Sequence, residues 1–151
     1  MISEDTDETI LSGGTMNKEP IQEFVSMKQA NEYLKQWQHR LFLDDWIIKL
    51  NFAEPNEMPN NAGYNNFCME KQSSIITIAR LTEDTRNRIT KIYQEFTLVH
   101  ELLHLKLNFV ENADTYEGKY LEIKEHQLLD QLAKSLIMAK YNLNYDWFKN
   151  F

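Results

Sequence analysis

Three residues of this 151-residue chain have the types and the spacing of a metal-dependent hydrolase: His100, Glu101 and His104, in the pattern His-Glu-x-x-His. They lie in a strongly periodic apolar segment, 89–109, which predicts a helix. On a helix, residues i and i+4 share a face, so both imidazoles can bind one metal ion. Glu101 is then close enough to act as a base on a water molecule beside the ion. The pattern predicts a zinc site with His100 and His104 as metal ligands and Glu101 as the catalytic residue.

A mononuclear zinc site usually takes a third ligand from the protein, and a second predicted helix, 116–140, offers candidates. Glu125 falls in the middle of the apolar stripe of this helix, which consists of Leu121, Leu128, Leu129, Leu132 and Leu136. A carboxylate on an apolar face is costly unless a cation or a donor compensates it. We therefore expect Glu125 to be the third ligand, with Glu122 and His126 as alternatives. A structural Glu125, neutralised by a lysine or a buried hydroxyl, is the other interpretation.

Composition and charge narrow the possible classes of protein. The chain has 16 basic and 23 acidic residues, a net charge of −7, and no conspicuous cluster of lysines or arginines. This disfavours a dedicated nucleic-acid surface or a surface for anionic membranes. The single cysteine, Cys68, excludes an internal disulfide and suits a reducing compartment. No apolar run has the length of a membrane span or a signal peptide, so we expect a cytoplasmic protein.

The remaining pattern predicts one small α+β domain. The acidic residues 1–19 lack periodicity and are expected to form a flexible leader, followed by a single domain over 20–151. Periodicity and flanking turn residues predict four elements before the two helices described above. They are a helix at 27–41, a strand at 46–52, a weaker strand at 63–69 and a further strand at 74–80. Their hairpin-like spacing favours a small, mostly antiparallel sheet of about three strands.

Two stretches, TLVHELLHL at 97–105 and EHQLLDQLA at 125–133, resemble the minimal gluzincin metallopeptidases, small zincin-like proteins common in bacteriophages and prophages. The resemblance covers about 26–140. It implies a zincin-like fold in which a twisted sheet lies over the active-site helix. It also implies zinc held by His100, His104 and Glu125, with Glu101 as general base. One departure is His126, since small gluzincins often have further acidic residues after the third ligand.

The expected function is hydrolysis of peptide bonds in a protein or peptide substrate by a zinc-activated water, in a bacterial or phage-infected host cell. Glu101 would take the proton of that water and deliver it to the leaving nitrogen. If strand 74–80 is an edge strand, it could bind an extended substrate by strand addition. Two alternatives stay open: a non-catalytic, zinc-stabilised binding or regulatory module of phage origin, and a metal-dependent hydrolase of a non-peptide amide. Glu101 weighs against the first, because a structural zinc site has no use for a base.

Overall fold

The computed structural model describes residues 18–58, 61–108 and 114–148. The elements along the chain are α1 (Met27–Arg40), β1 (Ile47–Ala53), η1 (Pro55–Glu57), β2 (Gly63–Cys68), β3 (Ser73–Ala79), α2 (Glu83–Arg86), α3 (Gln94–His104), α4 (Tyr116–Tyr141) and η2 (Tyr145–Phe148). The expected leader lies almost wholly outside the described residues. Within the described part of the chain, no helix is long and apolar enough to cross a membrane.

The three strands form one mixed sheet in the order β1-β3-β2. β2 and β3 are antiparallel, whereas β1 pairs with β3 in parallel. The predicted strands and the α+β class are thus confirmed, but the expectation of a mostly antiparallel sheet is wrong. Hairpin spacing fixes the pairing only across the short turn 69–72, and the longer connection 54–62 allows β3 to lie between its neighbours. β3 is therefore the central strand, and the edge strand next to α3 is β2.

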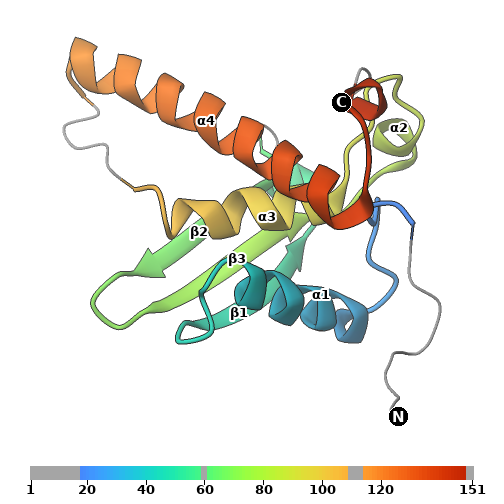
Figure 1. The fold of residues 1–151 in the computed structure, drawn as a ribbon, viewed down its shortest axis with the longest axis horizontal. Helices are drawn as coiled ribbons and strands as arrows, with labels where there is room; N and C mark the ends of the chain where they lie inside the picture. Colours follow the sequence, from blue (N-terminus) through green and yellow to red (C-terminus); the bar gives the residue numbers. More distant parts are fainter. Residues whose placement is uncertain (1–17, 59–60, 109–113, 149–151) are drawn as a thin grey trace.

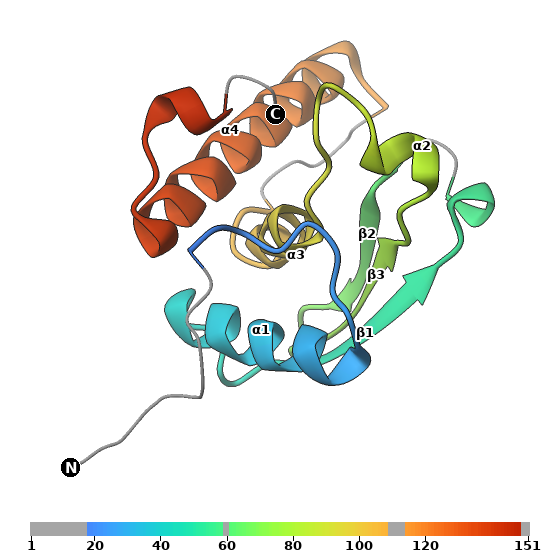
Figure 2. The same ribbon diagram turned by 90° about the vertical axis from the view of Figure 1, so that its right-hand side faces the viewer.

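Helices cover one face of this sheet. α1 and α3 lie against it, and α4 lies on the far side of α3 (Figures 1 and 2). The inward-facing residues of the strands and the apolar stripes of the helices form one core, whose most deeply buried members include Trp37, Leu43, Ile76, Ile78, Leu98, Leu102, Leu129 and Ile137. α3 is packed between the sheet, α1 and α4, so the helix with the His-Glu-x-x-His pattern has a fixed position in the domain.

A segment from far upstream fixes the start of α3. The helix begins at Gln94, later than the periodic segment that predicted it. The N–H groups of Gln94 and Glu95 donate to the carbonyls of Gln22 and Ile21 over 2.8 and 3.1 Å. The first N–H groups of a helix have no partner within it, and the N-cap residue Tyr93 supplies no side-chain bond. The backbone at 21–22 therefore takes the place of a capping side chain.

The carboxylate of Glu95 is fully buried and is compensated from several directions. It accepts hydrogen bonds from Ile21 N, Trp37 Nε1 of α1, and Lys140 Nζ and Tyr141 OH of α4, at 2.7–3.0 Å. Burial lowers the pKa of Lys140, and the charge of Glu95 opposes that effect. A buried ion pair is tolerated only when further hydrogen bonds satisfy its atoms. The carboxylate thus joins the N-terminal segment, α1 and α4 to the first turn of α3.

Replacing Glu95 by glutamine should strongly destabilise the domain. Glu95→Gln leaves the Lys140 charge buried without a counter-ion, which we expect to lower the free energy of unfolding by about 3–5 kcal/mol in a urea titration. Glu23→Gln is the matched control, since it removes a carboxylate that pairs with Arg86 at the surface. The control should lose far less stability. Equal losses in the two variants would show that Glu95 does not have this structural role.

Candidate metal centre

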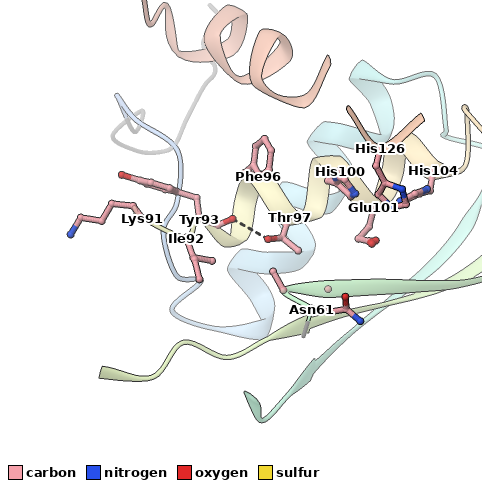
Figure 3. Close-up of a pocket in the computed structure, with 12 residues that line it drawn as sticks. Asn61, Lys91, Ile92, Tyr93, Phe96, Thr97, His100, Glu101, His104 and His126 are labelled. Carbon is pink, nitrogen blue, oxygen red and sulfur yellow. Dashed lines mark hydrogen bonds between the residues drawn. The ribbon is translucent and has the colours of Figure 1, made fainter. Parts of the chain in front are cut away.

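Three histidines meet beside α3. His100 and His104 project from successive turns of α3, and His126 approaches them from α4 (Figure 3). Their ring centroids are 5.0–5.8 Å apart, and one nitrogen of each lies within 4.8 Å of the others. Zinc–nitrogen bonds are about 2.0–2.1 Å long, so small side-chain rotations would bring these nitrogens onto one ion. We call these three residues the histidine cluster.

The partners of two Nδ1 atoms indicate which nitrogens are available to a metal. Nδ1 of His100 lies 2.9 Å from Oδ1 of Asp130, and Nδ1 of His126 lies 3.2 Å from the carbonyl oxygen of Glu122. A nitrogen that donates to an oxygen keeps its proton, and the other nitrogen then has the free lone pair. Both rings therefore offer Nε2. Asp130 lies four residues after His126 on α4, so one helix face supplies both a possible ligand and the partner of another.

Burial favours the uncharged form of the two histidines of α3. It lowers the pKa of His104 to about 4, and the neighbouring His100 and His126 act in the same direction. Burial also lowers the pKa of His100, although the carboxylate of Asp130 opposes this shift. A metal binds only the neutral imidazole. Both side chains are therefore in the metal-binding form at neutral pH.

Glu101 is 5% exposed and lies beside the histidine cluster in the wall of a cavity. Its Oε2 atom is buried and has no hydrogen-bond partner among the described residues, and burial raises the pKa of the carboxyl group to about 7. A buried carboxylate without a partner is destabilising. The arrangement is that of a group which can accept and release a proton near neutral pH.

The start of β2 approaches Glu101 closely. A Cβ atom on Gly63 would lie 2.6 Å from Cγ2 of Thr97 and 3.5 Å from Cγ of Glu101, so this position has no room for a larger residue. Two residues further along β2, Nδ2 of Asn65 donates to the carbonyl oxygen of Glu101 over 2.7 Å. Asn65 in turn accepts a hydrogen bond from Ser74 of β3. The sheet therefore holds the main chain of the metal-site helix directly.

A cavity of about 380 Å³ connects these groups. The histidine cluster and Glu101 lie at one end of it. Figure 3 shows Lys91 and Ile92 at the other end, with Phe96 and Thr97 between. The opposite wall is the segment that leads into β2, formed by Asn61, Ala62 and Gly63. The candidate metal centre thus opens into a space large enough for several atoms of a ligand.

The structure brings His100, His104 and Glu101 together as expected, but it places His126 beside them where Glu125 was expected. Among the described residues, Glu125 is not part of the group whose ligand atoms converge, and its buried Oε1 has no hydrogen-bond partner. The helical-wheel argument for Glu125 assumed a buried stripe along all of α4, whereas the N-terminal half of α4 projects beyond the core (Figure 1). Leu121 and Leu128 of the supposed buried stripe are 53% and 44% exposed.

The sequence contained a signal for the residues that do converge. The buried residues of α4 in the core are Leu129, Ala133 and Ile137, and His126 lies three residues before the first of them. A helix face continues at such spacings. Asp130 follows His126 by a further turn and was missed altogether, because a carboxylate becomes informative only when a histidine of another helix is known to face it.

No protein-family model matches the chain, and no curated protein or solved structure matches it significantly.

Zinc affinity should depend on His126 and hardly on Glu125. We expect His126→Ala to weaken zinc binding roughly 100-fold or more, because it removes one of the three converging nitrogens. Glu125→Ala, one residue away on the same helix, is the matched control and should change the affinity by less than about threefold. Competition titration with a chromophoric chelator measures both. The reverse order of the two losses would restore Glu125 as the ligand.

Asp130 should contribute to zinc affinity through His100. Asp130→Ala leaves Nδ1 of His100 without its acceptor, and we expect roughly tenfold weaker binding. Asp130→Asn retains an oxygen acceptor and should recover part of this loss. Glu117→Ala, which removes an exposed carboxylate from the first turn of α4, is the control and should have no effect. If Asp130→Ala binds zinc as well as the parent protein, the contact with His100 has no such role.

Proposed function

We propose that this protein is a zinc-dependent peptidase, with zinc bound by His100, His104 and His126 and with Glu101 as the general base. The observation that carries the proposal is the position of the Glu101 carboxylate. It is buried, without a hydrogen-bond partner among the described residues, and next to three converging imidazoles. A structural metal site has no need of such a group, whereas hydrolysis needs a base at this place.

The donor set suits zinc. Three neutral imidazole nitrogens are typical ligands of catalytic zinc, which keeps a fourth position open for water or substrate. The site differs from the gluzincin pattern that the sequence resembles, because its third ligand would be a histidine. A zincin-like arrangement, with the metal-site helix behind a mixed sheet, is part of the proposal and is supported by the packing of α3 against β2 and β3.

The chemical steps that the chain itself can perform centre on Glu101. Zinc, when bound, would polarise a peptide carbonyl and increase the acidity of water. Glu101 takes a proton from the attacking water at its buried carboxylate and later gives it to the leaving nitrogen. Asn65 keeps the backbone of Glu101 in place during both proton transfers.

An extended peptide is the substrate shape that the site favours. β2 pairs with β3 on one side, and no strand among the described residues pairs with its other edge, where N–H and C=O groups can accept a further strand. This edge starts at Gly63, next to Glu101, and a peptide added to it as a further strand would pass the histidine cluster. β3 cannot bind a peptide in this way, because it is the central strand and is paired on both sides.

Glu101→Gln should separate metal binding from catalysis. The amide has the size of the carboxylate but cannot accept a proton, so we expect hydrolysis of a casein or a peptide mixture to fall by roughly 10²–10⁴-fold. The zinc content, measured by atomic emission, should stay at the level of the parent protein. Unchanged hydrolysis would reject Glu101 as the base. A zinc-loaded parent protein that hydrolyses no amide bond would reject the peptidase proposal.

A further inference from the structure

A second cavity, of about 250 Å³, adjoins the one at the candidate metal centre. The two share part of their lining, namely Asn61, Ala62, Ile92 and Thr97. The second cavity therefore continues the space that leads away from the histidine cluster, past the start of β2. A ligand long enough to enter both would lie along the N-terminal half of α3.

The second cavity has an apolar floor and a basic rim. Met58 and Leu81 are 6% and 7% exposed and form part of its apolar lining. Its charged lining residues are Arg80 and Arg88, and no aspartate or glutamate is among the residues that line it. The chain as a whole has a net charge of −7, so this lining differs in sign from the overall charge of the protein. It should attract a carboxylate more strongly than the protein surface as a whole does.

The two arginines differ in their availability. Nε of Arg80 lies 3.1 Å from Oε2 of Glu54, and its guanidinium group lies over the ring of Phe52. Arg88 has no ion pair with any of the described residues. A guanidinium group offers a planar set of donors that matches a carboxylate. Of the two arginines, Arg88 is therefore the one whose donors are not engaged by a carboxylate within the described part of the chain.

The distance between the two cavities indicates which residue of a bound peptide would reach the second one. Gln94 lines the second cavity and His100 the first, six residues apart on α3. At about 1.5 Å per residue this is about 9 Å, and an extended peptide covers about 3.3 Å per residue. Gln94 thus lies about three peptide positions from the histidine cluster, and we use this spacing for a side chain that enters the cavity shared by Gln94 and Arg88.

We propose that the second cavity is a substrate subsite for an acidic residue, in which Arg88 binds the carboxylate and the floor at Met58 and Leu81 takes the aliphatic part of the side chain. The subsite rests on the proposed peptidase function, because it gives that function its substrate class: extended peptides with a glutamate or aspartate about three residues from the cleaved bond.

Cleavage of a peptide library by the zinc-loaded full-length protein tests this proposal. We expect acidic residues to be enriched roughly three- to tenfold at one position about three residues from the cut. Arg88→Ala should abolish the enrichment, and Arg88→Glu should replace it by a preference for lysine or arginine. Lys71→Ala removes one positive charge from the turn before β3, far from the cavity, and should keep the parent preference. A preference that survives in Arg88→Glu overturns the proposal.

A second measurement needs neither zinc nor turnover. In ¹⁵N-labelled protein titrated with N-acetylglutamate, the Nε–Hε signal of Arg88 should shift in a saturable way, and N-acetylglutamine should not shift it. The signal of Arg86, which is paired with Glu23, should stay in place. A shift without any peptide cleavage would keep the subsite and reject the peptidase. Cleavage without an acidic preference, together with no shift at Arg88, would overturn the subsite alone.

Discussion

The buried carboxylate of Glu95 is the interaction on which the position of the histidine cluster depends. It accepts hydrogen bonds from the N-terminal segment, from α1 and from the last turns of α4, and it stands at the start of the helix that carries His100 and His104. His126 is on α4, 14 residues before Lys140, or about 21 Å along the helix. Because Glu95 fixes the C-terminal end of α4 against α3, it also determines the direction of α4 and therefore the position of His126 relative to His100 and His104.

The candidate metal site contains buried polar groups that are less well compensated than those of the core around it. Glu101 has a buried oxygen without a partner among the described residues, and two of the three histidines are largely shielded from water. Such groups lower stability, and they persist because the sheet and the hydrogen bonds to Glu95 hold α3 in place. Gly63 and Asn65 connect β2 to this helix at Glu101 itself, so the rigid part of the fold and the reactive carboxylate are adjacent. A bound cation would offset both the buried, unpaired oxygen of Glu101 and the repulsion between the lone pairs of the converging imidazoles.

The sequence was informative where local periodicity decides the structure. The spacing of His100, Glu101 and His104 is a property of one helix, and the alternation in β1 and β3 is a property of single strands, so both were predictable. The order of the strands was not, because the connection 54–62 is too long for its proline and asparagine residues to fix which strand pairs with β1. The choice of His126 over Glu125 was not predictable either, although His126 was among the candidates. A helical wheel gives the apolar side of α4, but the buried side is set by where α4 crosses α3, and the exposed Leu121 and Leu128 belong to the part beyond that crossing.

The most direct test of the account is the coordination of zinc in the intact, zinc-loaded protein, measured by X-ray absorption at the zinc edge. The account predicts three imidazole nitrogens at about 2.0–2.1 Å and one further light atom in the fourth position. The multiple-scattering signal should fall from three imidazoles to two in His126→Ala. Two imidazoles with a carboxylate in the parent protein, unchanged in His126→Ala, would contradict the central claim that the three histidines form the metal centre.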